Sequence, residues 1–319
     1  HSVDGSKRGE TSMARSLDGG ITWTIEPFLL PGTEPQPSPG GVNFSHPDFA
    51  LKVVRTGGFC FSYDRAHTWQ GPFAFSDFKL GDKLSASTDP ALHRRQILSG
   101  RTDYIVNAPN DCHLFISVKD ERVQAGLADR AFAIRTRDGG KTFEFLGWMT
   151  GAEPPVVRSA MPATVRANDG TLVTTLRRRL DLKTGLPDEI KTGFRKNDLN
   201  WIDSYGSNDD GVTWSFLARI AFTDTSQQNG NPPSLVKLRD GRFAAAYGVR
   251  GKPFGIRARV SSDNGKTWGP ELMLRDDART WDIGYCRSIV RSDGKIVTVY
   301  YYATKEHFEQ HIAATIWSP

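Results

Sequence analysis

The sequence predicts an all-β protein: a six-bladed β-propeller with four-stranded antiparallel blades, forming a single domain over residues 1–319. Two turn signals and the strands between them lead to this prediction. An eight-residue turn sequence occurs five times, and an Asp-Gly turn recurs at a nearly constant distance after it. Short strand-like runs separated by regularly spaced turns are typical of propeller blades.

The eight-residue sequence, which we call the box, has the form SxDxGxTW. In such a turn the aspartate carboxylate accepts backbone N–H groups, and the glycine takes the positive φ that the turn requires. The final aromatic ring anchors the turn on apolar surface. These roles are structural, so we expect no box aspartate to be catalytic. The five copies are Ser16–Trp23, Ser62–Trp69, Thr136–Phe143, Ser207–Trp214 and Ser261–Trp268.

The second turn signal is Asp-Gly between β-rich runs, which predicts a β-hairpin. Asp169, Asp240 and Asp293 carry it, and they lie 31, 31 and 30 residues after the aspartate of the preceding box. Independent loops would not keep this spacing. The chain therefore repeats one supersecondary unit.

Each unit is an inner strand, an Asp-Gly hairpin, a second strand, a loop, a third strand, the box and a fourth strand. Blades two to five are expected to be complete, and blade one to be incomplete at the N-terminus. Blade six has no box and extends from GYCRSIV (284–290) to HIAATIW (311–317). In the clearest unit, blade five, the predicted strands are 233–238, 243–248, 256–260 and 270–275.

Composition excludes several functional classes. No apolar run approaches the roughly 18 residues of a membrane span, and no nucleic-acid-binding motif accompanies the net charge of +5. Three cysteines without CxxC spacing predict neither a disulfide framework nor a metal site, and we expect no cofactor. The first ten residues do not resemble a signal peptide. We expect a secreted or periplasmic protein whose signal segment is not present in this chain.

A functional site is expected on the face opposite the boxes, where inner strands start and second and third strands are joined. The side chains predicted there are rich in arginine. A guanidinium pairs with a carboxylate through two parallel hydrogen bonds, so this rim suits a carboxylated sugar. Its predicted members are His46, Asp48, Arg101, Arg158, Arg178 (representing Arg177 to Arg179), Arg250, Tyr285 and Arg287, with Glu10 in the loop before the first box.

The five boxes resemble the Asp-box (BNR) repeats of the sialidase (neuraminidase) superfamily over essentially the whole chain. This resemblance implies a tyrosine nucleophile at the start of blade six, a position that Tyr285 matches. It also implies three carboxylate-binding arginines and an acid/base in blade one, for which Asp4 and Glu10 are the candidates. Arg158 departs from the family, because it stands where the glutamate partner of the tyrosine is expected.

We therefore predict a glycoside hydrolase acting on a terminal acidic sugar, either sialic acid or a uronate. The catalytic candidates are Tyr285, Asp48, His46 and Glu10. Two alternatives stay open at this point: a polysaccharide lyase with His46 or Tyr285 as its base, and a non-catalytic carbohydrate-binding propeller. In each case the expected partner is an acidic oligosaccharide or polysaccharide, with neither nucleic acid nor a membrane involved.

Overall fold

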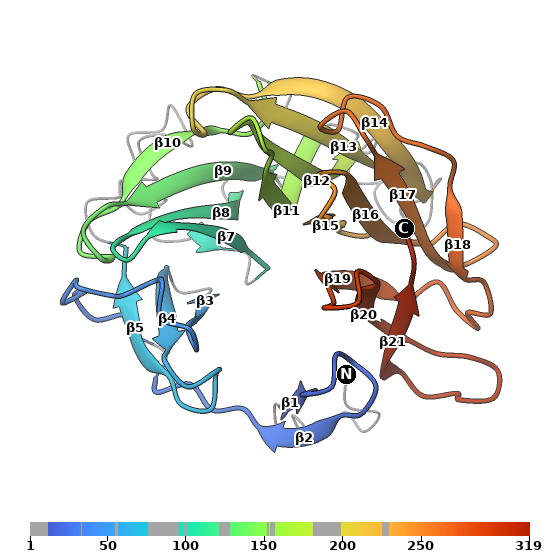
Figure 1. Cartoon of the computed structure of the whole chain (residues 1–319), viewed down its shortest axis with the longest axis horizontal. Coiled ribbons are helices and arrows are strands. Elements are labelled where there is room, and N and C mark those ends of the chain that lie inside the picture. The colour runs from blue at the N-terminus through green and yellow to red at the C-terminus, as the bar shows by residue number, and fades with distance from the viewer. Residues whose placement is uncertain are drawn as a thin grey trace, which may run out of the picture.

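The computed structural model shows antiparallel β-sheets arranged in a ring, which is a β-propeller (Figure 1). The structure describes residues 12–32, 34–54, 57–75, 96–98, 101–120, 128–151, 153, 157–180, 199–224 and 230–319. Five of its sheets have three to five strands and form blades, for which we keep the predicted numbers two to six. The remaining sheet has two strands, so the described residues do not contain six complete blades.

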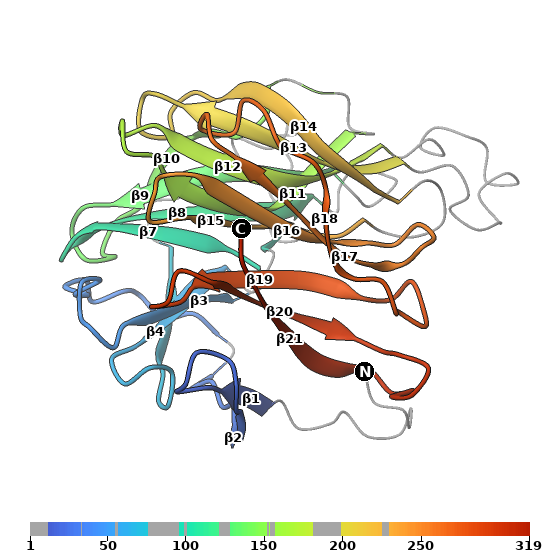
Figure 2. The same cartoon turned by 45° about the vertical axis from the view of Figure 1, so that its right-hand side comes forward.

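The first three sheets along the chain are the two-stranded sheet, blade two and blade three. The two-stranded sheet lies between blades two and six (Figure 1, Figure 2). It consists of β1 (Ser12–Arg15) and β2 (Thr24–Pro27); blade two consists of β3 (Ala50–Val54), β4 (Gly58–Ser62) and β5 (Gln70–Ala74); and blade three of β6 (Gln96–Leu98), β7 (Asp103–Ala108), β8 (Asp111–Asp120), β9 (Ala128–Thr136) and β10 (Glu144–Trp148).

Blades four and five have the four antiparallel strands that the sequence predicts. In blade six the observed strands β19 and β21 coincide with the predicted ones. Blade four contains β11 (Val157–Arg166), β12 (Leu172–Leu180), β13 (Leu199–Ser207) and β14 (Ser215–Asp224); blade five contains β15 (Ser234–Lys237), β16 (Phe243–Val249), β17 (Gly255–Ser261) and β18 (Leu272–Arg275); blade six contains β19 (Gly284–Val290), β20 (Ile296–Tyr302) and β21 (His311–Trp317).

Blade two differs from the prediction of four strands. No strand precedes β3 within the described residues 34–54, and the sheet has three strands. Ala50 pairs with Ser62, the first residue of the second box, so β3 starts at the box end of the blade. The residues before β3 therefore lie on the box face, and the prediction that they lead into an inner strand is wrong.

Box five shows how the repeated turn is held. Asp263 Oδ1 accepts the Thr267 backbone N–H at 2.8 Å and the Ser261 hydroxyl at 2.9 Å, while Oδ2 accepts the Thr267 hydroxyl at 2.6 Å. Trp268 Nε1 donates to the Gly265 carbonyl at 3.2 Å. The same contacts between aspartate and threonine occur in the other four boxes. Their carboxylates are used in local hydrogen bonds, which agrees with a structural role.

Removing one box carboxylate should destabilise the fold without impairing catalysis. We expect Asp263→Ala to lower the free energy of unfolding by about 1–3 kcal/mol, because several turn donors lose their acceptor. Turnover per folded molecule should stay unchanged. Urea unfolding and active-site-normalised kinetics measure the two quantities, with the exposed Asp276→Ala in the same blade as the control. A loss of kcat at unchanged stability would contradict the structural role.

The boxes also predict how stability depends on pH. Hydrogen bonds from the box threonines lower the pKa of Asp18, Asp64 and Asp209. A lowered folded-state pKa stabilises the protein above the unfolded-state value of about 3.9, and this contribution is lost as the pH falls through the folded-state pKa. We expect the melting temperature to fall steeply below about pH 4. The fall should be shallower in Asp263→Ala, and equal pH dependence of the two proteins would contradict this account.

The cores lie between the faces of neighbouring blades. One core joins blades two and three around Phe59, Leu114 and Phe132, and another joins blades five and six around Ile256 and Tyr300. All three cysteines are buried free thiols, among them Cys286 in the second of these cores. The described part of the chain contains no helix long and apolar enough to cross a membrane.

Candidate functional site

The candidate site lies at the end of the blades opposite the boxes. In blade five Phe243 pairs with Ser261 at the box end, and Val249 pairs with Gly255 at the other end. Arg250 follows Val249 at that second end. The inner strands β7, β11, β15 and β19 surround the centre of the ring (Figure 1). Hydrogen bonds from Arg101 to Pro233 and Cys286, and from Arg287 to Thr102, connect distant parts of the sequence there.

Tyr285 stands at an irregular position in β19. The register shifts between Gly284 and Arg287, which marks a β-bulge, and Tyr285 has a φ of 56°. A non-glycine residue in this left-handed region is strained, and such residues concentrate at functional sites. Bulges in turn change the direction in which a side chain points. The next residue, Cys286, places its side chain in the core between blades five and six.

Asn231 holds this bulge from the neighbouring blade. Its side chain is fully buried; Oδ1 accepts the Tyr285 N–H at 2.8 Å, and Nδ2 donates to the Ile283 carbonyl at 3.0 Å. Gly284 has a φ of 108°, and a Cβ added there would lie 2.0 Å from Asn231 Oδ1. Glycine is therefore required before the tyrosine. The sequence gives no sign of this contact between Asn231 and residues 283–285.

Two arginines from other blades pack on the Tyr285 ring. The guanidinium carbon of Arg101 lies 5.5 Å from the ring centroid, and that of Arg250 lies 5.8 Å from it. Arg101 also donates to the carbonyls of Pro233 and Cys286, so it connects blade three with blades five and six. The structure thus brings together three of the predicted site residues.

Arg177, and not Arg178, is the member of the arginine triplet at this site. Arg177 interacts electrostatically with Tyr285 and Arg250, and burial lowers its pKa. Arg178 points to the other side of β12, where it forms ion pairs with Glu153 and Asp203. Adjacent residues on a strand face opposite sides, so only one of the two can reach the site. The choice of Arg178 as representative is therefore corrected.

Arg158 and Arg287 lie beside this group rather than over the tyrosine ring. Arg158 is buried, with Nη1 3.7 Å from Asp129 Oδ2, and the same carboxylate interacts with Arg177. Arg287 donates to the Thr102 carbonyl at 2.7 Å, which links blade six to blade three. Both are thus near the predicted face, and each contacts another part of the protein.

His46 and Asp48 are elsewhere. Asp48 Oδ1 accepts Nε of Arg65, a box-two residue, at 2.5 Å, and the His46 ring lies 4.8 Å from that of Tyr63 in the same box. Both therefore lie on the box face, because β3 runs away from the boxes instead of toward them. Their placement in the catalytic site is corrected. Glu10 and Asp4 lie outside the described residues.

A pocket of about 580 Å³ opens beside Tyr285. The rings of one tryptophan and two tyrosines, one imidazole, one guanidinium and one carboxylate line it. Aromatic faces suit the apolar faces of sugar rings. Among the described residues, the Tyr285 hydroxyl makes no hydrogen bond. The lining residues are Arg250, Trp281, Asp282, Tyr285, Tyr301, Gln310, His311 and Ile312.

The carboxylate of this pocket is held by its neighbours. Asp282 Oδ1 accepts the Tyr301 hydroxyl at 2.7 Å, and Oδ2 accepts the Gln310 amide at 2.8 Å. Arg250 donates to the Tyr301 hydroxyl and lies 3.5 Å from Asp282 Oδ1. This network orients Arg250, and both carboxylate oxygens of Asp282 accept hydrogen bonds from the protein itself.

The charges around the site are mainly positive. Burial, followed by the nearby Arg287, lowers the pKa of Arg101 to about 9, which still leaves it charged at neutral pH. Asp103, at the start of β7, is a partly buried carboxyl among these cations, and desolvation raises its pKa. Its oxygens accept the N–H groups of Thr164 and Tyr104 at 2.9 and 3.0 Å. We call Arg101, Arg177, Arg250 and Tyr285 the axial cluster.

Comparisons with known proteins establish the fold of the chain. No protein-family model matches the sequence, and no curated protein matches it. A protein of unknown function from Dyadobacter fermentans DSM 18053 is 22% identical with a TM-score of 0.65; the match covers 97% of this chain and 84% of that one.

Two solved glycosidases share the fold at lower identity. The Penicillium chrysogenum α-L-arabinanase, complexed with arabinobiose, is 18% identical with a TM-score of 0.50, covering 69% of this chain and 62% of that chain. The Hadza microbial sialidase Hz136 is 13% identical with a TM-score of 0.52, covering 86% and 54%. The chain thus spans less than two thirds of each glycosidase, and at these identities the similarity shows a shared propeller fold alone.

Proposed function

We propose that the protein is a glycoside hydrolase that removes a terminal acidic sugar, a sialate or uronate, from a glycan. The observation that carries this proposal is the packing of Arg101 and Arg250 on the Tyr285 ring beside an aromatic pocket. The fold shared with glycosidases is consistent with it but does not supply the substrate.

The charge distribution favours an anionic substrate. Arg101 and Arg250, from different blades, pack on the Tyr285 ring, and Arg177 from a third blade interacts electrostatically with the same tyrosine. Asp282, the carboxylate that lines the pocket, is hydrogen-bonded to Tyr301 and Gln310. A substrate carboxylate could pair with these guanidinium groups through charge-assisted hydrogen bonds.

Tyr285 is the proposed nucleophile. Its oxygen attacks the anomeric carbon while the bond from that carbon to the leaving-group oxygen breaks; the phenol proton passes to solvent through the open pocket. The arginine cations stabilise the charge on the attacking oxygen. An acid protonates the leaving group, and water then hydrolyses the glycosyl-tyrosine. Glu10, two residues before β1, is the proposed acid from the sequence resemblance.

We propose that the β1–β2 sheet is the outer half of the predicted blade one, which would complete a ring of six blades. The box lies between its two strands, as it lies between β17 and β18 in blade five. We also propose a secreted or periplasmic location, where acidic glycans are encountered.

A substrate screen tests the function. Aryl sialosides, aryl uronides and acidic polysaccharides are incubated with the protein and read for released phenol, reducing ends and near-ultraviolet absorbance. Release from an aryl sialoside or uronide without new absorbance supports the proposal. Absorbance of an unsaturated sugar would show a lyase instead. Binding without cleavage of any substrate would show a non-catalytic propeller.

A further inference from the structure

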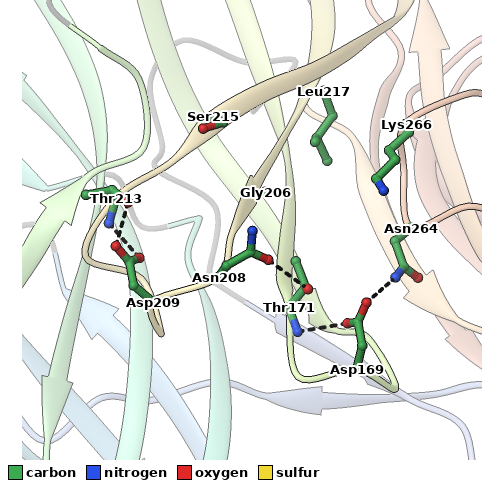
Figure 3. Close-up of a pocket in the computed structure, with 10 residues that line it drawn as sticks. All are labelled: Asp169, Thr171, Gly206, Asn208, Asp209, Thr213, Ser215, Leu217, Asn264 and Lys266. Atoms are coloured by element: carbon green, nitrogen blue, oxygen red, sulfur yellow. Dashed lines mark hydrogen bonds between the residues drawn. The ribbon is translucent and has the colours of Figure 1, made fainter.

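A second hollow lies at the opposite end of the molecule from Tyr285, between blades four and five. It has a volume of about 300 Å³ and lies beside the fourth and fifth boxes (Figure 3). Eight of its ten lining residues are polar or charged, and Leu217 is the one large apolar side chain. The lining residues are Asp169, Thr171, Gly206, Asn208, Asp209, Thr213, Ser215, Leu217, Asn264 and Lys266.

The hollow exists because a side chain found at the preceding blade interface is missing. Between blades three and four, Arg135, the residue before box three, reaches Asp210, the fourth residue of box four. The corresponding pair between blades four and five is Gly206 and Asn264. Gly206 has no side chain to cross the gap, so the space that Arg135 fills at one interface is open at the next.

Hydrogen bonds within the wall fix its polar side chains. Thr171 donates to Asn208 Oδ1 at 3.0 Å, and Asn264 Nδ2 donates to Asp169 Oδ2 at 2.9 Å, the latter joining blade four to blade five (Figure 3). Asp209 is used by its own box. These contacts hold the asparagine side chains in place before any ligand arrives, which lowers the entropy cost of binding.

Four polar groups remain for a ligand. In the part of the chain that the structure describes, no hydrogen bond is made by the Asn208 amide nitrogen, the Asn264 amide oxygen, the Ser215 hydroxyl or the Lys266 ammonium group. They comprise two donors, one acceptor and one group that can do both. Such a set matches vicinal hydroxyls, each of which donates and accepts.

The charge of the wall argues against an anion. Asp169 and Asp209 are opposed by one cation, Lys266. Hydrogen bonds from Thr171 and Thr213 respectively lower the pKa of the two carboxyls, so both are ionised at neutral pH. In the axial cluster, by contrast, there are three arginines and no carboxylate.

We propose that this hollow is a second carbohydrate site, which binds one neutral sugar residue independently of the axial cluster. Asn208 and Lys266 donate to sugar hydroxyls, Asn264 accepts from one, and Leu217 contacts the apolar face of the ring. The site would hold an uncharged part of a glycan on the box face.

Filling the hollow tests this proposal. Binding of methyl glycosides of glucose, galactose and mannose is measured by saturation-transfer NMR, with methyl glucuronide as the anionic probe. We expect at least one neutral glycoside to bind the parent, and Gly206→Arg to weaken that binding at least about tenfold. A Cβ at Gly206 would lie 3.2 Å from Leu217 Cδ1, a flexible contact. Ser262→Arg, at an exposed position of box five, adds the same side chain outside the hollow as a control.

Two further variants separate the sites. The double variant Asn208→Ala, Lys266→Ala should lose neutral-glycoside binding without adding bulk. Arg250→Ala in the axial cluster should keep that binding while it weakens methyl glucuronide. The proposal is overturned if no neutral glycoside binds the parent, if binding survives both hollow variants, or if only Arg250→Ala abolishes it. None of these outcomes depends on cleavage, so the proposed hydrolase function is tested separately.

Discussion

Tyr285→Phe should lower kcat by at least about 100-fold on a substrate that the parent cleaves, because the attacking oxygen is removed. The phenylalanine ring keeps the packing surface on which Arg101 and Arg250 lie. The backbone contact also survives, since Asn231 binds the N–H of residue 285 and not its side chain. Fold and ligand affinity should therefore be nearly unchanged. Steady-state kinetics, a melting curve and a Kd for the product measure the three effects.

Tyr63→Phe is the matched control for this variant. It removes a tyrosine hydroxyl on the box face, where that hydroxyl accepts the Asn43 N–H at 2.6 Å. Its kcat should equal that of the parent. If Tyr285→Phe retains near-parental activity, Tyr285 is not the nucleophile, and the chemistry of the site must be assigned to another group.

Arg250→Ala should weaken an anionic ligand by about 2–4 kcal/mol, or roughly 30- to 900-fold in Kd. Arg250 lines the pocket and lies over the Tyr285 ring, so its guanidinium can reach a substrate carboxylate. A neutral analogue of the same sugar should lose much less. Calorimetric titration with a methyl uronide and its uncharged methyl glycoside gives both values.

Two controls separate charge from structure in this experiment. Arg250→Lys keeps the positive charge but not the bidentate geometry, so its loss should be intermediate. Arg239→Ala makes the same change in net charge at an exposed position of the Asp-Gly hairpin in the same blade, and should leave both affinities unchanged. Equal losses for the anionic and neutral ligands would mean that Arg250 acts by holding Tyr301 and Ile283.

The repeat unit could be predicted from the sequence because its stabilising contacts are local. The box aspartate bonds to residues two to four positions away, as Asp263 does with Ser261 and Thr267. A turn held within eight residues leaves its pattern in the sequence wherever it occurs. Blade six has no box, but its Asp-Gly hairpin is equally local, with the Lys295 N–H donating to Asp293, and β19 has the predicted bounds of 284–290.

Blade two could not be predicted in this way. The sequence around His46 and Asp48 resembles the start of an inner strand, but the pairing of Ala50 with Ser62 reverses the direction of the strand that follows. Strand direction depends on which neighbour a strand pairs with, and that choice is made in the tertiary structure. The two side chains accordingly lie on the box face.

The sequence by itself determined the all-β propeller, the structural role of the boxes, and the face on which arginines and Tyr285 gather, because hydrogen bonds and strand alternation within a few residues decide these features. Only the tertiary structure decided that Arg177 rather than Arg178 joins Tyr285. It also decided that Asn231, 54 residues earlier in the chain, holds Tyr285 in its left-handed conformation. Both depend on packing between residues of different blades, and sequence spacing carries no information about that packing.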